Sequence, residues 1–291
     1  MTLAERYHRN ILMFGAEGQK KLRNTSVLVA GAGGLGSAII QPLALLGVKS
    51  IASVDDEGLD ETNRNRLIGA RATDPIGMSK VLIADRNIKE INPDVDSIPL
   101  PYSIISEAAF EAVKAVDWVF GCFDGDGPRA ILNELCAAYK KPYIDLASDV
   151  PEQTGYGGRV CVSLGNDRCL DCLDELDHDA VRRYFETADH LAQQNAIYGI
   201  DKMALEEKGP SVAPLNGVIA SLAAMEFMVA VTGLRAPASL LRYRGHMSMV
   251  AVGRDSPRPD CHRCKGIWGK GSAAGIERYL EIPHLRRVKA S

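Results

Sequence analysis

The amino-acid sequence predicts an α/β fold with a Rossmann-like, mostly parallel central sheet and flanking helices. Short apolar runs alternate with longer helical stretches through the N-terminal half, a pattern typical of parallel strands joined by crossover helices. The first apolar run, residues 26–30, ends in a glycine-rich turn that opens a helical stretch. The chain has 291 residues, of which 46% are hydrophobic, and this content suffices to bury the core of one large domain.

The individual elements of the N-terminal half have recognisable limits. Gly47 favours a helix C-terminus, and the pair Asn92-Pro93 stops a helix. The sequence predicts strands at residues 26–30, 50–54, 117–121 and 142–147, and helices at residues 37–46, 80–91 and 129–139.

The pattern changes after residue 150. Residues 155–164 and 240–252 predict strands that extend the sheet in a mixed direction, and residues 211–232 predict a helix. Residues 177–208 are polar and charged, and we expect a mobile or partner-contacting insertion there. The low apolar content of the end of the chain predicts a loosely held tail. We expect one domain that spans the chain and divides into residues 1–150, 151–266 and 267–291.

Composition and charge argue against several classes of function. The formal net charge is -3 with scattered lysines and arginines, whereas a nucleic-acid-binding surface normally shows a basic excess. The first ten residues lack the apolar core of a signal peptide. The most apolar segment, residues 218–234, contains Glu226 and is shorter than a bilayer span, so we interpret it as a buried helix. We expect a cytoplasmic protein that binds neither membranes nor nucleic acid.

A glycine motif predicts a nucleotide-binding turn. Gly31, Gly33 and Gly36 form Gly-x-Gly-x-x-Gly, with Gly34 inside it, between a predicted strand and a predicted helix. Such glycines let the backbone turn tightly and approach phosphate, and a helix N-terminus favours negative charge. Asp55 ends the next strand, where a ribose-binding acid is expected. The motif alone fits an NAD-dependent enzyme equally well.

Charged and polar residues beyond the second and third strands favour ATP over a redox cofactor. ATP carries several negative charges and adenylation releases pyrophosphate, so the site needs cations for the phosphates and an acid to hold Mg²⁺. A dehydrogenase has no comparable need. The residues that could meet it are Glu57, Asn63, Arg66, Lys80, Asp124 and Arg129.

With these residues the sequence resembles the ThiF/MoeB/HesA family, the bacterial relatives of ubiquitin-activating enzymes. The resemblance extends from Arg6 to Cys264. Its motifs recur in family order: Arg-Tyr-x-Arg-Asn at 6–10, Gly-x-Gly-Gly-Leu-Gly at 31–36, Val-Asp-x-Glu at 54–57, Thr-Asn-x-x-Arg at 62–66, Gly-x-x-Lys at 77–80, an aspartate with an arginine five residues later at 124–129, and two Cys-x-x-Cys pairs.

There are two departures from the family pattern. Leu67 follows Arg66 where glutamine is usual, and the segment between Arg66 and Lys80 is slightly longer than usual. Neither departure removes a charge, so the expected chemistry stands.

The resemblance implies roles for the matched residues. Asp55 would hold the ribose hydroxyls, while Asn63, Arg66 and Lys80 would contact the triphosphate. Asp124 would hold Mg²⁺ near the reacting carboxylate, and Asp126 is a rival for the metal. Arg9 would act across a homodimer interface. The expected catalytic set is Asp124, Arg66, Lys80 and Arg9, and the expected nucleotide-binding set adds Gly31, Gly33, Gly34, Gly36, Asp55, Glu57 and Asn63.

Two Cys-x-x-Cys pairs predict a structural zinc site. Cys169 and Cys172 form the first pair, and Cys261 and Cys264 form the second. Four thiolates supply a closed tetrahedral site with no open position for catalysis. Zinc would tie the C-terminal strands to the preceding part of the chain and stabilise the fold. Disulfides are not expected in a chain without a secretory signal.

The other three cysteines, Cys122, Cys136 and Cys161, lie in apolar stretches. Many relatives in the family pass the adenylated carboxylate to a cysteine just ahead of the helix predicted here at 211–232. Residues 206–211 contain no cysteine. A nucleophilic thiolate needs exposure and a neighbour that lowers its pKa, and we expect no catalytic cysteine.

The resemblance implies an ATP-dependent adenylyltransferase. It would activate the C-terminal carboxylate of a small ubiquitin-like or sulfur-carrier protein, usually ending in Gly-Gly, as an acyl-adenylate with release of pyrophosphate. Residues 1–150 would bind the nucleotide, and residues 151–266 the partner and zinc. One alternative is the same chemistry on a peptide or a tRNA-linked carboxylate, although the near-neutral charge disfavours tRNA. Another is a nucleotide-binding adaptor without turnover, which the intact set of charged positions disfavours.

Overall fold

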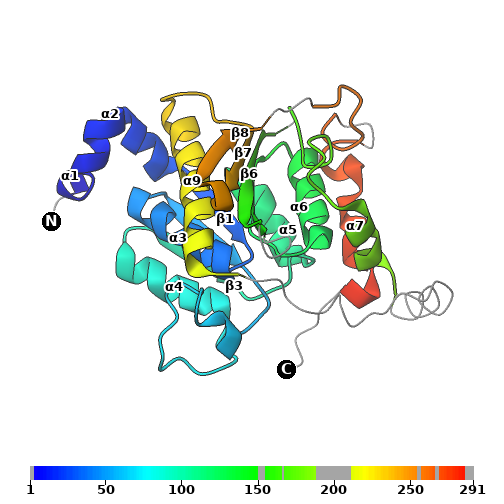
Figure 1. Cartoon of the computed structure of the whole chain (residues 1–291), viewed down its shortest axis with the longest axis horizontal. Coiled ribbons are helices and arrows are strands. Elements are labelled where there is room, and N and C mark those ends of the chain that lie inside the picture. Colours follow the sequence, from blue (N-terminus) through cyan, green and yellow to red (C-terminus); the bar gives the residue numbers. More distant parts are fainter. Residues whose placement is uncertain are drawn as a thin grey trace.

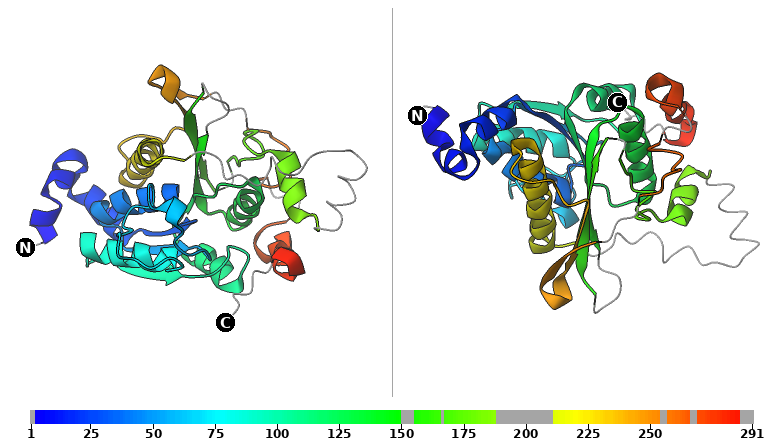
Figure 2. Two further views of the ribbon diagram at one scale, coloured as in Figure 1. Left: turned by 60° about the horizontal axis from the view of Figure 1, so that its bottom comes forward. Right: turned by 90° about the horizontal axis from the view of Figure 1, so that it is seen from above.

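The computed structural model describes residues 3–149, 155–165, 167–187, 211–253, 257–265 and 269–285. The strands of these residues form one eight-stranded sheet in the order β3-β2-β1-β4-β5-β6-β7-β8. Helices cover both faces of the sheet (Figures 1 and 2). The predicted α/β fold with a mostly parallel sheet and an antiparallel extension is confirmed.

The first five strands are parallel. β1 (Ser26–Ala30) has β2 (Ser50–Val54) and β3 (Asp96–Leu100) on one side, and β4 (Trp118–Gly121) and β5 (Pro142–Asp149) on the other. Every residue of β2 and the last four of β1 are buried, as expected for strands covered on both faces. Parallel strands bring their carboxyl ends to one edge, where ligands bind in such sheets.

Helices divide between the two faces because successive strand residues point in opposite directions. Val27 and Val29 of β1 join a core with α3 (Gly34–Leu46), α4 (Lys80–Ile91) and α9 (Ala213–Thr232). Leu28 and Ala30 join a second core with α5 (Glu107–Ala115), α6 (Asp126–Ala138) and α7 (His178–Phe185). The N-terminal helices α1 (Leu3–Arg6) and α2 (His8–Asn24) extend to one side of the molecule (Figure 1). α2 is kinked at Gly15, where φ is 77°.

Three antiparallel strands extend the sheet and continue the edge at which the parallel strands end. β6 (Gly157–Leu164) is antiparallel to β5, and β7 (Leu240–Arg244) is antiparallel to β6. The short helix η3 (Gly245–Met247) then leads into β8 (Met249–Val252). Gly157 is in register with both Asp149 and Arg244. The carboxyl end of β7 therefore lies at the same edge as the carboxyl end of β5.

α9 is the longest helix that the structure describes, and it contacts α3 on one side and β5 and β6 on the other. By length and composition alone its 20 residues could cross a membrane, so the expectation that this segment is too short for a span is not met. Its interpretation as a buried helix is confirmed. Glu226 is 3% exposed and accepts hydrogen bonds from Arg235 at 2.6 and 2.8 Å.

Part of the expected loose tail, residues 269–285, packs onto the domain. Residues 269–285 form the short helices η4 (Gly271–Ala274), η5 (Ile276–Glu281) and η6 (Pro283–Leu285). Ile276 is fully buried, and the Tyr279 hydroxyl donates to Glu134 Oε2 of α6 at 2.7 Å. This part of the expected loose tail therefore packs onto the domain, because a few anchoring contacts replace a continuous apolar stripe. The boundaries at residues 150 and 266 stay a prediction.

The insertion expected at residues 177–208 is described as far as residue 187. Asp177 begins α7 by accepting hydrogen bonds from the backbone amides of Asp179 and Ala180. The helix buries Val181 against the second core. Residues 188–208 lie outside the described part of the chain, so a mobile or partner-contacting role for them stays a prediction.

Candidate active site

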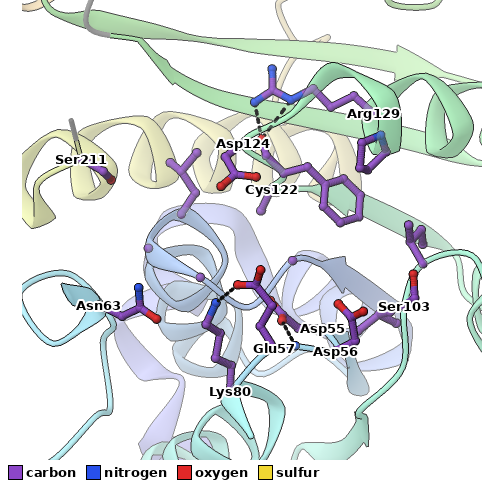
Figure 3. Close-up of a pocket in the computed structure, with 18 of the residues that line it drawn as sticks. Asp55, Asp56, Glu57, Asn63, Lys80, Ser103, Cys122, Asp124, Arg129 and Ser211 are labelled. Atoms are coloured by element: carbon purple, nitrogen blue, oxygen red, sulfur yellow. Dashed lines mark hydrogen bonds and ion pairs between the residues drawn. The ribbon is translucent and has the colours of Figure 1, made fainter. Parts of the chain in front are cut away.

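A cavity of about 500 Å³ opens at the carboxyl edge of the parallel strands. It lies beside the turn after β1, the end of β2 and the loop after β4. Its walls also include Lys80, the first residue of α4, and Ser211, which lies just before α9. Figure 3 shows Asp124 on one side of this space, facing Asp55, Glu57 and Lys80 on the other. The predicted residues that line it are Gly31, Gly33, Gly34, Asp55, Glu57, Asn63, Arg66, Lys80, Asp124 and Arg129.

The glycine motif forms the turn from β1 into α3. Gly31 has φ +89°, and a Cβ there would lie 2.9 Å from the carbonyl oxygen of Cys122. A Cβ at Gly36 would lie 1.8 Å from the carbonyl oxygen of Gly31, so no larger residue fits without moving the turn. Gly36 is therefore needed for helix packing and does not itself line the cavity. The result is a helix N-terminus aimed at the cavity, which suits a phosphate group.

Asp55 is held rigidly at the end of β2. Its Oδ2 accepts from the backbone amide of Ala32 at 2.7 Å, and its Oδ1 accepts from that of Glu57 at 2.8 Å. Burial raises the pKa of this carboxyl, and Lys80 opposes the shift. A fixed acid at this point of the sheet suits the hydroxyls of a ribose.

Cationic and amide side chains lie along the floor of the cavity. Lys80 begins α4, is 5% exposed, and its Nζ contacts Glu57 Oε2 at 2.5 Å. Asn63 is buried in the short helix η1 (Glu61–Asn63), which is capped by the preceding residue, Asp60. Arg66 follows and donates to the carbonyl oxygen of Thr62 at 2.6 Å. These groups could take up the negative charge of a triphosphate.

The two departures from the family motif have local explanations. Leu67 is buried and packs with Leu59 and Ile83 in a small cluster beneath this floor. The longer segment before Lys80 is fastened by Arg64, which donates to the carbonyl oxygens of Arg71 and Asp74 at 2.7 and 2.9 Å. Neither departure displaces the cationic residues from the cavity.

Asp124 is presented by the loop after β4. The loop is anchored from beneath by Arg129, which is 5% exposed and donates from Nε to the carbonyl oxygen of Phe123 at 3.0 Å. The Asp124 side chain is exposed to the cavity. Asp126 does not line the cavity, and its Oδ2 accepts from the backbone amide of Asp177 at 2.8 Å. Of the two rival acids, Asp124 is the one free to hold a cation.

Arg9 is the predicted catalytic residue that the structure does not bring to the cavity. It lies exposed on α2, which extends away from the sheet (Figure 1). Its expected action on the active site of a second subunit stays a prediction.

Several residues of the cavity were missed by sequence reasoning. Ser211 lines it, and the Nδ2 of Asn216 donates to the Ser211 hydroxyl at 3.1 Å. Asn216 is 1% exposed, and a Cβ at Gly34 would lie 2.4 Å from its Nδ2. Leu285 from the end of the chain also lines the cavity. The sequence signal that could have indicated Asn216 as a site residue is its position as an amide in an otherwise apolar helix. No local pattern indicates Leu285.

The four predicted zinc ligands meet in one cluster. The Sγ atoms of Cys169, Cys172, Cys261 and Cys264 all lie within 4.8 Å of one another, and all four residues are buried. The Cys169–Cys261 and Cys172–Cys264 sulfur distances are 3.5 and 4.0 Å. A tetrahedron with Zn–S bonds of about 2.3 Å requires sulfur separations of about 3.8 Å. The cluster therefore fits zinc, and it joins the segments after β6 and β8.

The remaining cysteines are buried as expected. Burial raises the pKa of the Cys122 and Cys136 thiols, and it raises the pKa of Cys161 to about 12. Cys122 also lines the cavity, beneath the Asp124 loop (Figure 3). None of the three has the exposed, low-pKa environment of a nucleophile.

Comparison with known proteins agrees with this geometry. Residues 7–264 match the model of the ThiF family. The chain is 29% identical over 264 residues to the sulfur carrier protein ThiS adenylyltransferase of Escherichia coli K12, covering 88% of this chain and 94% of that protein. It is 28% identical over 270 residues to the vegetative protein HesA of Trichormus variabilis, covering 90% of each.

Solved structures show the same fold. The crystal structure of E. coli MccB with ATP has a TM-score of 0.69 at 21% identity, over 89% of this chain and 74% of that one. The structure of MccB with MccA-N7isoASN has a TM-score of 0.71 at 20% identity, over 91% and 75%. With the family match over most of its length, the chain belongs to the ThiF family and is an enzyme of the adenylyltransferase type.

Proposed function

We propose that this enzyme uses ATP to adenylate the C-terminal carboxylate of a small ubiquitin-like or sulfur-carrier protein, with release of pyrophosphate. The observation that carries the proposal is one cavity lined by the glycine turn, Asp55, the cations Arg66 and Lys80, and the exposed Asp124. This set matches the needs of adenylation, namely cations for the phosphates and an acid near the reacting groups.

The chemistry follows from the two sides of the cavity. A carboxylate oxygen of the partner attacks the α-phosphorus of ATP, and the bond from that phosphorus to the oxygen bridging to the β-phosphate breaks. Arg66 and Lys80 take up the charge that develops on the pyrophosphate leaving group. Asp55 holds the ribose so that the α-phosphate lies between the α3 N-terminus and Asp124. Positioning and charge neutralisation supply the rate enhancement.

Two metals belong to the proposal. Mg²⁺ would be held by Asp124, whose free carboxylate offers the oxygen ligand that this ion prefers, and when bound it would neutralise phosphate charge. Zinc would be held by the four-cysteine cluster and would serve the fold, because its coordination is closed.

The acyl-adenylate is the proposed end point on the enzyme. The pKa values of Cys122 and Cys161 are raised by burial, so neither thiol is ionised near neutral pH. An external sulfur donor or amine would then attack the adenylate directly.

The class of partner is proposed from the relatives. Proteins similar to this chain are named adenylyltransferases of sulfur carrier proteins, among them those of E. coli and Thermus thermophilus. A peptide substrate is the second candidate, because the named ligands of the MccB structures include MccA. We also propose a cytoplasmic homodimer in which Arg9 reaches the cavity of the second subunit, since Arg9 is exposed on a projecting helix.

ATP–pyrophosphate exchange tests the proposal. Small sulfur-carrier proteins and synthetic peptides would be supplied with either a free or an amidated C-terminus. Exchange is expected with at least one free carboxylate and with none of its amidated counterparts. Exchange that ignores amidation would contradict activation of the C-terminus. NAD binding without ATP binding would indicate that the glycine motif binds a dinucleotide, as in a dehydrogenase.

A further inference from the structure

A second cavity of about 360 Å³ lies beside the antiparallel strands. Its walls come from the end of β5, the start of β6, and the end of β7 with η3. We call it the arginine groove, after Arg159, Arg242 and Arg244, which line it together with His246 and Asp149. None of these groups belongs to the nucleotide site apart from Asp149.

The arginine groove continues the edge on which the nucleotide cavity opens. Asp149 lines both cavities. The register of β5, β6 and β7 aligns Asp149 with Gly157 and Gly157 with Arg244. An extended chain with its end at Asp124 can therefore run along this edge, past Asp149, and into the groove.

The charges of the groove are unevenly matched. Arg159 Nε contacts Glu175 Oε2 at 3.0 Å, and Arg242 also pairs with Glu175. The side chains of Arg244 and His246 are exposed and have no ion-pair or hydrogen-bond partner among the residues that the structure describes. The lining thus holds three arginines against one carboxylate, and one of these arginines is uncompensated. An acidic group is the complement of such a surface.

The position of that acidic group along the partner follows from strand geometry. From β4, which presents Asp124, to β7, which presents Arg244, the sheet order gives three strand steps. At about 4.8 Å per step this is about 14 Å, and an extended chain advances about 3.3 Å per residue, so the separation is about four residues. Asp149 lies between and would repel an acidic residue nearer the end of the chain.

We propose that the arginine groove binds the segment just before the partner's C-terminus, and that Arg244 with His246 selects an acidic residue about four positions before the terminal one. The inference rests on the proposed function, because it assumes that the terminal carboxylate lies at Asp124. It adds a sequence requirement to the partner. An RNA occupant is disfavoured, because a single uncompensated arginine gives little phosphate affinity.

Fluorescence anisotropy on the full chain tests this directly. The probes are labelled decapeptides ending in Gly-Gly, neutral except for one glutamate at either the fifth or the third place from the end, each with a glutamine counterpart. Glutamate at the fifth place should tighten binding about fivefold over glutamine, as for a partly exposed ion pair. Glutamate at the third place should not tighten it. The gain should shrink at high salt.

Charge reversal makes the test specific to Arg244. In Arg244→Glu the preference should invert, so that a peptide with lysine at the fifth place binds better than one with glutamate. Lys49→Glu is the matched control, because Lys49 is exposed at the start of β2, on the opposite edge of the sheet. Arg244→Gln gives a milder variant if the reversal disturbs folding.

Several outcomes would overturn the inference. Equal or undetectable binding of all peptides to the wild-type chain would do so, as would a preference unchanged in Arg244→Glu. So would a short single-stranded RNA that binds more tightly than the acidic peptide through Arg244. Failure of the proposed function has a different signature: the peptide preference persists, but no carboxylate supports ATP–pyrophosphate exchange.

Discussion

Asp124 depends on a buried arginine for its position. Arg129 is held beneath the loop by the carbonyl oxygen of Phe123 and lies 3.7 Å from both Asp126 and Asp145. Asp145 is fully buried, and its Oδ2 has no hydrogen-bond partner in the described residues. Its charge is balanced by Arg129 and, at 3.8 Å, by Arg159. Arg159 lines the arginine groove, so a run of alternating charges connects the two cavities.

The burial of the three isolated cysteines predicts that their thiols react slowly with alkylating reagents. The pKa of Cys161 is raised from 9.0 to about 12, which lowers its thiolate fraction near neutral pH about a thousandfold. Burial shifts the pKa of Cys122 in the same direction. Iodoacetamide should therefore label these thiols slowly in the folded protein and rapidly in denaturant, as followed by mass spectrometry.

The same reasoning predicts that Cys122→Ala retains ATP–pyrophosphate exchange. A covalent enzyme–partner adduct that thiols cleave, and that this substitution removes, would show that Cys122 is a nucleophile despite its burial.

Among the elements, those with strong local signals were predictable from the sequence. β1, β2 and α4 have the predicted limits, because each is a buried run ended by a glycine, an aspartate or the Asn92-Pro93 stop. β3 and α5 were not predicted. β3 is an edge strand that is partly exposed throughout and contains Pro99, so it lacks an apolar signature and depends on pairing with β2.

Site residues, like the elements, were predictable where a local sequence signal marks them. Residues in motifs next to strand ends, such as Asp55 and Asp124, were found because the fold fixes where strand ends meet. Asn216, Leu285 and the arginine groove reach their positions through contacts between distant segments, which no local pattern encodes. The ordered part of the tail is a further example, since Tyr279 and Arg278 act through Glu134 of α6.

The four-cysteine cluster links the segments after β6 and β8. Native mass spectrometry should find about one zinc per chain. Cys261→Ser or chelation should lower the melting temperature by roughly 5 °C or more, because metal binding is coupled to folding, while ATP affinity stays unchanged. Cys136→Ser is the control, since its sulfur lies outside the cluster and zinc content should persist. A metal-free wild-type protein of equal stability would refute the zinc site.

Glu134 of α6 anchors the segment of residues 269–285, and its contacts predict how much this anchor contributes to stability. It is 4% exposed and contacts Arg263 at 2.6 Å, Tyr279 at 2.7 Å, and Arg278. Glu134→Gln removes the buried negative charge that faces Arg278 and Arg263, and leaves Arg263 only its pair with Asp171, so it should reduce the free energy of unfolding by about 2–3 kcal/mol. Denaturant unfolding measures this. Glu111→Gln, which breaks only the surface pair with Lys114, should cost less than about 1 kcal/mol. Equal effects would mean that Glu134 does not anchor the tail.

At the scale of the whole molecule, one edge of the sheet carries both parts of the proposed reaction. The parallel strands present the nucleotide cavity, and the antiparallel strands continue the edge to the arginine groove. Among the residues that the structure describes, the helices on the two faces leave a cavity at this edge. α2, which carries Arg9, extends to one side of the domain (Figure 1), where a second subunit could receive it.

Subunit mixing tests the action of Arg9 in trans. Arg9→Ala and Asp124→Ala homodimers should each be inactive in pyrophosphate exchange. After mixing and subunit exchange, half of the dimers would be hybrids with one intact site, so about a quarter of wild-type activity should return. Mixed samples that stay inactive, although hybrids are detected by native mass spectrometry, would place Arg9 outside the active site of the second subunit.

In the proposed reaction, a carboxylate and ATP react beside Asp124. Its most direct test is carboxylate-dependent ATP–pyrophosphate exchange in Asp124→Ala compared with Asp126→Asn. Asp124→Ala should lower exchange by about 10²-fold or more, as expected when a group that stabilises the transition state is removed. Asp126→Asn should remain close to wild type, because Asp126 lies outside the cavity and its substitute can still accept the bond from the Asp177 amide. Wild-type exchange in Asp124→Ala, or equal loss in both variants, would contradict the assignment.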